Sequence, residues 1–277
     1  MKTIFDRIIQ MSLEEDAPFG DITTNSIVPA DRRVSGRFIA KDDGVLCGID
    51  IAQRTFELVG GDFEMVKYFK DGDSIKKGDV IAEISGNART ILTGERTALN
   101  LMQRASGIAT ATAKAVKAVA GTKAHIADTR KTMPGLRLLD KYAVRVGGGV
   151  NHRFNLSDGV LIKDNHIAAA GSIKNAVEAA RRHCPHTLKI EVEVENFVQL
   201  YEALEAKADI IMLDNMSNED MAKAVQIIGG RAIVEASGNM GEKDLSEVAK
   251  TGVDLISIGS LTHSVKTLDI SLKFSII

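Results

Sequence analysis

Apolar residues in the second half of the chain fall into short runs separated by longer amphipathic stretches. Stretches such as SIKNAVEAARRH and NEDMAKAVQII, with apolar residues at helical spacing, lie between these runs. From the second run onward the strand-like pattern recurs roughly every 20 to 30 residues, which predicts parallel strands joined by crossover helices. The runs lie at 124–128, 159–163, 189–195, 209–214, 231–237 and 254–260.

The first part of the chain has a different pattern. Residues 1–16 predict an amphipathic helix, and 36–49 predict two strands around an Asp42-Asp43-Gly44 turn. A helical segment follows at 51–60, and short apolar pairs divided by Gly-containing turns follow at 69–86. These short pairs are typical of small hammerhead or sandwich-like β units. Segment 93–119 then predicts a helix capped by Thr93 and bent or broken near Gly107.

Polar or small residues end every one of the six later runs. In a parallel α/β barrel the carboxyl ends of all strands open on one face, where the active site lies. The pattern therefore favours a barrel with fewer than eight strands and a single polar mouth. A doubly wound open sheet, which normally binds at one switch point, is the alternative. The residues that end the runs are Asp128, Lys163, Glu193, Asp214, Ser237 and Gly259-Ser260.

Composition narrows the classes of function. The net charge is −2 and the pI is near 6.3, and only 4% of residues are aromatic, with no Trp. These values argue against a nucleic-acid-binding protein, which is normally basic and uses aromatic stacking. The sequence holds no run of about 18 apolar residues, and its first residues lack the apolar centre of a signal peptide. Two distant cysteines, Cys47 and Cys184, fit a reducing cytoplasm.

Positive charge is concentrated between residues 130 and 163. This segment holds seven Lys and Arg residues against Asp140 and Asp158, a net charge of +5 in a chain whose total is −2. Such concentration predicts a site for a small, heavily anionic ligand. The alternative is an ordinary solvated surface, and that reading stays open for the cations with helical spacing. Those three are Arg137, Lys141 and Arg145.

Several strand-end residues have the chemistry that an anion site needs. Arg130 supplies a planar fork for carboxylate or phosphate, and Lys131 supplies a point charge. Glu193 and Asp214 could hold Mg²⁺ or bind ribose hydroxyl groups, or one of them could only balance a lysine. Glu191 and Glu195 alternate with Glu193 on one side of the strand, so the sequence leaves open which of the three faces the ligand.

Two small-residue turns after late strands predict phosphate loops, although either could be an ordinary turn. They are Ser237-Gly238-Asn239 and Gly259-Ser260. By contrast, the pair of histidines in 183–186 lacks partner ligands and predicts a plain loop. Gly147-Gly148-Gly149 does not have the spacing of a dinucleotide-binding motif.

A set of motifs distributed over nearly the whole chain resembles the quinolinate phosphoribosyltransferase family. The resemblance implies an N-terminal α/β sandwich domain, hammerhead-like, at 1–108 and an incomplete, open α/β barrel at 109–263. It also implies that 264–277 packs back on the first domain, and that the protein is a homodimer or higher homo-oligomer. The motifs are GDITT, GERTALN, SGIAT, DTRKTMPGLR, KYAVRVGGGVNHR, LIKDNH, EVEVE, LDN, EASGN and SIGSLTHSVKTLDISLKF.

The resemblance also implies the reaction. Family members join quinolinate to phosphoribosyl pyrophosphate with Mg²⁺, and they release nicotinate mononucleotide, pyrophosphate and CO₂. Such ligands need a cationic mouth that stabilises a departing phosphate and holds carboxylates. Loss of CO₂ from the ring position beside nitrogen can be stabilised by the pyridinium that forms, so no Schiff-base lysine is required.

Roles follow for single residues from the motifs that they match. Lys131, Lys163, Glu193 and Asp214 correspond to the catalytic set, and Glu193 and Asp214 also to the acids serving ribose and Mg²⁺. Arg96 resembles the arginine that reaches into the neighbouring subunit's site. The substrate-binding set is Arg96, Thr129, Arg130, His152, Arg153 and Lys163, and the phosphate-binding set is Ser237, Gly238, Asn239, Gly259, Ser260 and His263. Asn239 stands where many relatives have Gly.

Two other functions remain open from the sequence. A related phosphoribosyltransferase could act on another aromatic acid such as nicotinate, although the Arg130, His152 and Arg153 group favours a dicarboxylate. A non-catalytic anion-binding or carrier protein would need a modifiable lysine at a hairpin tip, and Lys76 and Lys77 are the candidates.

Overall fold

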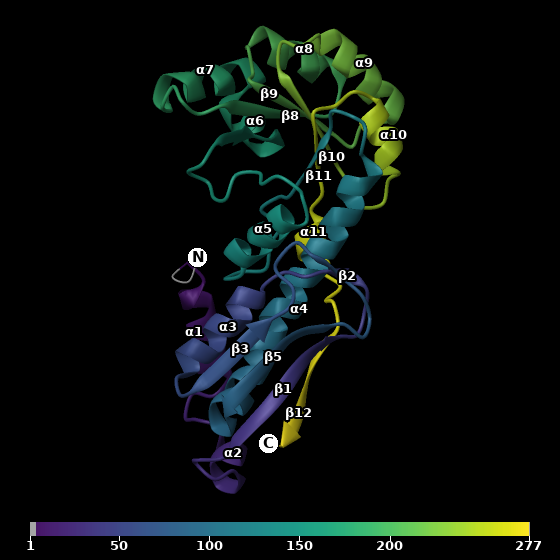
Figure 1. Ribbon diagram of the computed structural model, residues 1–277. Coiled ribbons are helices and arrows are strands. Elements are labelled where there is room, and N and C mark those ends of the chain that lie inside the picture. Colours follow the sequence, from purple (N-terminus) through teal and green to yellow (C-terminus); the bar gives the residue numbers. More distant parts are fainter. Residues whose placement is uncertain (1–3, 277) are drawn as a thin grey trace. The chain divides into compact units, whose positions relative to one another are not determined.

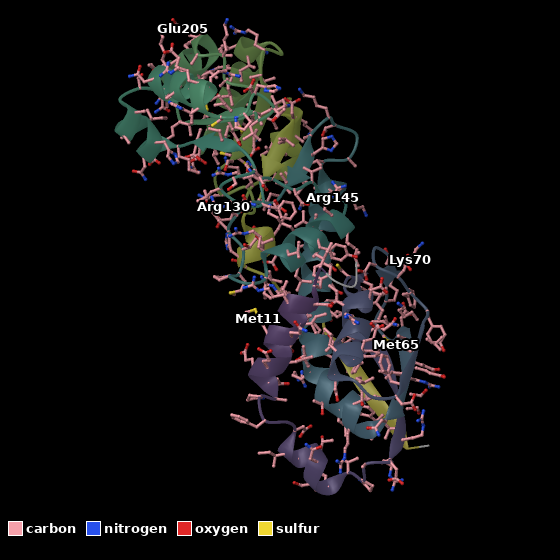
Figure 2. The ribbon with its side chains drawn as sticks, turned by 90° about the vertical axis from the view of Figure 1, so that its left-hand side faces the viewer. Met11, Met65, Lys70, Arg130, Arg145 and Glu205 are labelled. Carbon is pink, nitrogen blue, oxygen red and sulfur yellow. The ribbon has the colours of Figure 1, made fainter. Side chains whose placement is uncertain are left out.

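The computed structural model describes residues 4–276, which form two units. Unit 1 contains the chain up to Ala113, the insertion Met133–Gly148 and the segment from Ser264 onward, and unit 2 contains Lys114–Thr132 and Gly149–His263. Figure 2 labels Met11 and Met65 in unit 1 and Arg130 and Glu205 in unit 2. The sequence placed the division near residue 108 and did not assign 133–148 to the N-terminal unit.

Unit 1 is built on an antiparallel sheet with the strand order β12-β1-β5-β3. Its strands are β1 (Arg33–Ala40), β3 (Phe63–Lys67), β5 (Val80–Asn87) and β12 (Ile270–Ile276), and a second small sheet pairs β2 (Gly44–Val45) with β4 (Ser74–Ile75). The C-terminal strand β12 thus lies beside β1 (Figure 1), in a register that joins Phe38 to Leu272. Buried apolar side chains such as Phe38, Phe56 and Ile84 form the core on this sheet.

The helices of unit 1 account for the rest of its core. They are α1 (Asp6–Asp16), α2 (Ile22–Ile27), α3 (Ile49–Val59), the main part of α4 (Ala88–Ala118) and α5 (Arg137–Val146). The predicted helices at 1–16 and 51–60 are confirmed by α1 and α3 for the residues described. Phe5, Ile51, Leu101 and Val144 belong to one apolar cluster that these helices share.

The two strands expected within 36–49 are present as β1 and β2, but they do not pair with each other. β1 pairs with β5 and β12, whereas β2 pairs with β4. The acidic turn binds another turn: Lys77 donates its backbone N–H to the Asp43 carboxylate at 2.9 Å, and Gly78 donates to the Ala40 carbonyl at 2.9 Å. The Asp43 side chain therefore holds the turn at 77–78, and β2 pairs with β4 instead of with β1.

The long helix α4 begins earlier than predicted and does not break. The Asn87 carboxamide oxygen accepts the backbone N–H groups of Arg89 and Thr90 at 2.9 and 3.2 Å, so Asn87 rather than Thr93 satisfies the first turn. Gly107 lies inside the helix, and a Cβ there would come within 2.2 Å of the Lys266 carbonyl oxygen. The glycine is therefore explained by close passage of the chain leading to β12, not by a bend.

Unit 2 contains an open parallel sheet with the order β6-β11-β10-β9-β8-β7. The first strand pairs with the last, as in a barrel, and the sheet stays open between β6 and β7. Neighbours in sequence are otherwise neighbours in space, so the doubly wound alternative is wrong and the incomplete barrel is confirmed. The strands are β6 (His125–Ala127), β7 (Val160–Ile162), β8 (Ile190–Val194), β9 (Ile210–Asp214), β10 (Ile233–Ser237) and β11 (Leu255–Ser257).

Helices cover the outer face of this sheet (Figure 1). Several begin at a polar cap near the end of the preceding strand: Asn196 accepts the N–H of Gln199 at 3.0 Å, and Ser217 accepts that of Asp220 at 3.1 Å. The face beneath them is wholly apolar, with residues such as Val192, Leu213 and Val234 in the core. The helices are α6 (Asp164–Ala170), α7 (Ile173–His183), α8 (Phe197–Glu205), α9 (Asn218–Ile228), α10 (Leu245–Lys250) and α11 (Ser260–His263).

Candidate active site

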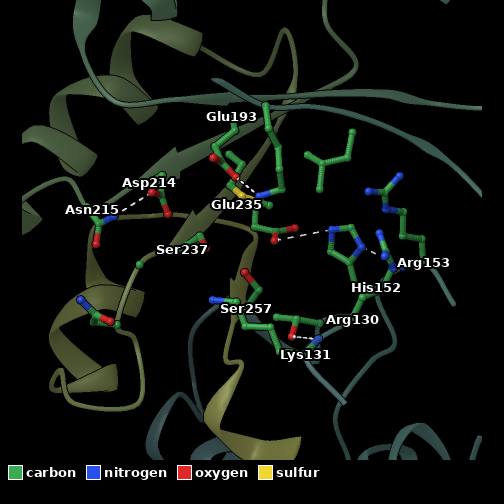
Figure 3. Close-up of a pocket in the computed structure, with 16 residues that line it drawn as sticks. Arg130, Lys131, His152, Arg153, Glu193, Asp214, Asn215, Glu235, Ser237 and Ser257 are labelled. Atoms are coloured by element: carbon green, nitrogen blue, oxygen red, sulfur yellow. Dashed lines mark hydrogen bonds and ion pairs between the residues drawn. The ribbon is translucent and has the colours of Figure 1, made fainter. Parts of the chain in front are cut away.

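A cavity of about 440 Å³ lies within unit 2 at the carboxyl ends of its strands (Figure 3). It gathers side chains from residues 129 to 257, so segments far apart in sequence meet there. Eleven of the residues predicted for the site are among those lining it. The lining residues are Thr129, Arg130, Lys131, His152, Arg153, Leu161, Lys163, Glu193, Met212, Asp214, Asn215, Glu235, Ser237, Gly238, Asn239 and Ser257.

Strand register explains why these side chains converge. Met212 is paired with Glu193 on one side and Glu235 on the other, and Asp214 is paired with Ser237. Because alternate residues of a strand point to the same face, all five side chains point away from the helix-covered core. The strand-end residues Lys163, Glu193, Asp214 and Ser237 therefore project into one opening. Asp128, which the sequence also placed there, is fully buried and lies outside the lining.

Two arginines form a fixed cationic wall. Arg153 donates from Nη1 to the Gly159 carbonyl oxygen at 2.8 Å, and Arg130 has a buried Nε with no hydrogen-bond partner among residues 4–276. Burial, followed by repulsion from Arg130, holds the pKa of Arg153 below its usual value. Two guanidinium groups held this close repel each other, so this wall is suited to an anionic ligand.

The two predicted lysines, Lys131 and Lys163, are held by different parts of unit 2. Lys163 follows β7 and forms an ion pair with Glu193. Lys131 is exposed, and its backbone carbonyl accepts the Thr262 hydroxyl at 2.8 Å. A Cβ on Gly259 would lie 3.0 Å from the Lys131 side chain, so the turn after β11 contacts this lysine directly. Both ammonium groups can therefore reach an anion in the cavity.

Glu193 and Asp214 provide carboxylate oxygens at the ends of the neighbouring strands β8 and β9. Glu193 is mostly buried against Lys163, and Asp214 accepts the side-chain N–H of Asn215 at 2.7 Å. Oxygen ligands from one or two carboxylates, completed by substrate phosphates, are what Mg²⁺ takes in proteins. The residues present thus fit the predicted magnesium ion. Glu195 is exposed beyond the strand, outside the cavity lining.

The turn after β10 has the backbone of a phosphate-binding loop. Gly238 has φ +89°, and a Cβ there would lie 2.3 Å from the Asn215 side-chain oxygen. Asn215 and Asn239 are non-glycine residues with positive φ, at 54° and 51°. Asn tolerates the left-handed region better than most residues, which explains how Asn215 and Asn239 adopt these angles.

His152 lies at the base of the cavity in contact with two buried glutamates. Its Nε2 is 3.1 Å from a Glu191 oxygen and 3.8 Å from a Glu235 oxygen. Burial and then repulsion from Glu191 raise the pKa of Glu235 to about 7. Glu235 was missed in the sequence, although it precedes Ser237 by two residues and therefore shares its face. Asn215 and Ser257 were missed as well.

Some predicted residues lie outside this cavity lining. Gly259, Ser260 and His263 stand beside it: a Cβ on Gly259 would be 3.2 Å from the His263 ring, and one on Gly241 would be 2.2 Å from the Ser260 hydroxyl. Arg96 is exposed on α4 in unit 1.

Three of the seven clustered cations also belong to unit 1. Arg137, Lys141 and Arg145 lie on α5, where Lys141 is fully buried and so is not a surface cation. The +5 segment is therefore divided between the two units, and only four of its cations line the cavity. Within the described residues, no helix is long and apolar enough to cross a membrane.

A parallel α/β sheet with a cationic cavity at its carboxyl edge is typical of α/β-barrel enzymes that act on anionic substrates. Family models confirm and narrow this class: residues 21–106 match the quinolinate phosphoribosyl transferase N-terminal domain, and residues 108–273 match its C-terminal domain. The chain belongs to the quinolinate phosphoribosyltransferase family, as the sequence motifs predicted.

Individual relatives agree over nearly the full length. The chain is 46% identical to a probable nicotinate-nucleotide pyrophosphorylase (carboxylating) from Bacillus subtilis, over 95% of this chain and 90% of that protein. It is also 46% identical to the corresponding pyrophosphorylase of Mycobacterium leprae, over 95% of each chain. The crystal structure of NadC from Streptococcus pyogenes superposes with a TM-score of 0.94 at 44% identity, covering 100% of this chain and 99% of that one.

Proposed function

We propose that this protein transfers the phosphoribosyl group of phosphoribosyl pyrophosphate to quinolinate and releases pyrophosphate and CO₂, yielding nicotinate mononucleotide for NAD biosynthesis. One observation supports this most strongly: a paired-arginine wall and two lysines share one cavity with two carboxylates and a phosphate loop. That combination matches a dicarboxylate acceptor and a polyphosphate donor bound side by side. The names of the relatives support the same reaction.

Arg130 and Arg153 hold the two carboxylates of quinolinate. Guanidinium groups bind carboxylates through two parallel hydrogen bonds, which fix orientation as well as charge. Arg153 is already held by Gly159 through one nitrogen, so its remaining donors are available in a set direction. Thr129 lies on the same wall. A monocarboxylate such as nicotinate would leave part of this buried positive charge uncompensated.

Lys131 and Lys163 stabilise the negative charge that builds on pyrophosphate as the bond to the sugar breaks. The anomeric carbon becomes oxocarbenium-like in the same step, and the carboxylates of Glu193 and Asp214 lie on the side where they can favour that charge and bind the ribose hydroxyl groups. Donors placed in advance around developing charge supply a large part of catalysis. The turn at Ser237-Gly238-Asn239, with Gly259-Ser260 and His263 beside Lys131, binds the phosphates.

Glu193 and Asp214 would hold Mg²⁺ together with the donor's phosphates. When bound, the ion neutralises phosphate charge and orients the leaving group. The protein itself positions the acceptor nitrogen against the anomeric carbon, which is catalysis by proximity and orientation. After transfer, the pyridinium nitrogen stabilises the electron pair left on the neighbouring ring carbon when CO₂ departs, and a proton then replaces the carboxylate there.

The assembly is also part of the proposal. Arg96 is exposed on α4 and matches the family's GERT arginine, so we place it in the active site of a neighbouring subunit in a homodimer or larger homo-oligomer. We further propose that the reaction takes place in the cytoplasm, where the two free cysteines would stay reduced.

The reaction is tested with the purified protein, quinolinate, phosphoribosyl pyrophosphate and Mg²⁺. Nicotinate mononucleotide and pyrophosphate should form in equal amounts, and chelation of the metal should stop turnover until Mg²⁺ is restored. Replacing quinolinate by nicotinate provides the control for substrate class, and we expect little or no product from it. Comparable turnover with nicotinate would favour the alternative of a related transferase for another aromatic acid.

A further inference from the structure

The ring of His152 is held on both of its nitrogens by the chain itself. Arg153 donates its backbone N–H to Nδ1 at 2.8 Å, while Nε2 faces Glu191 at 3.1 Å and Glu235 at 3.8 Å (Figure 3). A nitrogen that accepts an N–H cannot carry a proton, so Nδ1 is bare. The imidazole is therefore in the neutral form with its proton on Nε2, pointed at the two carboxylates.

Both glutamates are buried where they face the ring. Their side chains are only 5% and 1% exposed, and each has one buried oxygen without a hydrogen-bond partner among the described residues. Two buried carboxylates side by side are unfavourable unless they share a proton or face a donor. Such a costly arrangement points to a functional reason.

The His152 ring and its neighbours hold Arg153, a residue of the cavity wall, in place. Asp128 accepts the His152 backbone N–H at 2.8 Å and the Asn151 side-chain N–H at 2.6 Å, which holds the start of the segment. The ring nitrogen Nδ1 then holds the peptide N–H of Arg153, and Gly159 holds its guanidinium. The backbone on which Arg153 stands is thus oriented by the ring, and the ring is oriented by the glutamates.

We propose that Glu191 and Glu235 are positioning residues that act through His152 to fix Arg153, and so determine the affinity of the site for the dicarboxylate substrate. His152 supports substrate binding through Arg153, by locking the position of its neighbour. This inference rests on the proposed function of the cavity, and it assigns roles to two buried glutamates through their contacts with the His152 ring.

Variants of Glu191 separate the role of the acceptor from that of the charge. Glu191→Gln keeps an oxygen that can accept the Nε2–H, so its KM for quinolinate should stay close to that of the wild type. Glu191→Ala removes the acceptor, and its KM for quinolinate should rise roughly 10- to 100-fold, the usual effect of losing a residue that orients a ligand-binding group. The KM for phosphoribosyl pyrophosphate should be unchanged in both. Glu195→Ala, on the exposed end of the same segment, is the matched control and should behave as wild type.

A second measurement is made on the wild-type protein, and a variant is needed only to assign the signal. Nitrogen NMR of the histidine rings, with the His152 signal assigned by its loss in His152→Gln, reports which nitrogen carries the proton. We expect a proton on Nε2 only. A proton on Nδ1, or a doubly protonated ring at pH 7.5, would overturn the proposal.

The KM values of the Glu191 variants also test the positioning role. Equal KM values for quinolinate in Glu191→Ala and Glu191→Gln, or a parallel loss for both substrates in a variant that melts like the wild type, would overturn the positioning role. If the wild-type protein itself makes no nicotinate mononucleotide, the proposed function fails, whereas the NMR result still tests the geometry of the ring.

Discussion

The side chains around the cavity differ in how firmly each is held, and the difference matches the part that each plays. Arg130 and Arg153 are half-buried in one wall, and Arg153 is held there by the Gly159 carbonyl, as a site for a rigid aromatic dicarboxylate requires. Lys131 is exposed and the Lys163 side chain is 43% exposed, so both can adjust to a flexible polyphosphate. The ion pair between Lys163 and Glu193 must open or be shared when the donor binds.

The lysines therefore give a prediction at this scale. Lys131→Ala or Lys163→Ala should lower kcat by about 100-fold or more, because each removes a cation from the developing pyrophosphate charge. Both variants should keep the wild-type melting temperature, since neither ammonium group is in the core. Lys174→Ala, an exposed lysine on α7, is the matched control. Wild-type turnover in either cavity variant would remove that lysine from the mechanism.

Most of these residues could be predicted from the sequence because each ends an apolar run. Glu235 could not, because it lies inside a run, and only its spacing of two from Ser237 marks it as facing the cavity. Glu191 was one of three alternating glutamates, and choosing between them needs the position of His152, which lies in a distant segment. Contacts between distant segments leave no periodic signal in a sequence.

At the scale of elements, the strands of unit 2 use one alternating pattern to form both the core under the helices and the lining of the cavity. Residues such as Val192, Leu213 and Val234 face the helices, and the residues between them face the cavity. This pattern made the six strands predictable. The start of α4 and the pairing of β2 were not, because Asn87 and Asp43 act through side-chain hydrogen bonds that outweigh the local propensity.

The turn after β10 gives the prediction for this scale. Gly238→Ala places a methyl group 2.3 Å from the Asn215 side-chain oxygen, so the loop must shift and the KM for phosphoribosyl pyrophosphate should rise roughly tenfold or more. Gly230→Ala is the control: its φ is +77°, but no atom lies within 4 Å of the added Cβ. Both changes carry a backbone cost of about 1 to 2 kcal/mol. An equal effect of the two on the KM would show that the loop has no binding role.

At the scale of the whole molecule, the chain is assembled from discontinuous pieces. Unit 1 takes in the C-terminal strand and residues 133–148, and the incomplete barrel of unit 2 is formed by the segments on either side of that insertion. The sequence could show that a turn-rich, strand-like part comes first and that a part with alternating strands and helices follows it. It could not show that the insertion carrying three of the clustered cations joins the N-terminal unit, because burial of α5 there depends on apolar contacts such as Leu139 and Val144 with other helices.

Arg96 provides the prediction that belongs to the assembly. Arg96→Ala should be nearly inactive alone, because it removes one carboxylate or phosphate contact from each site. Mixing it with inactive Lys163→Ala under conditions that exchange subunits should restore activity, since a mixed dimer contains one site with both residues intact. Each variant taken alone through the same exchange conditions is the control and should stay inactive. Absence of any restored activity in mixed oligomers would place Arg96 in a role within its own chain.

The most direct test of the whole account is the release of CO₂ from quinolinate labelled in the carboxylate beside the ring nitrogen. We expect labelled CO₂ only when phosphoribosyl pyrophosphate and Mg²⁺ are both present, with one CO₂ for each pyrophosphate formed. Folded protein that releases no label in the complete mixture, or that releases it without the phosphoribosyl donor, would contradict the account.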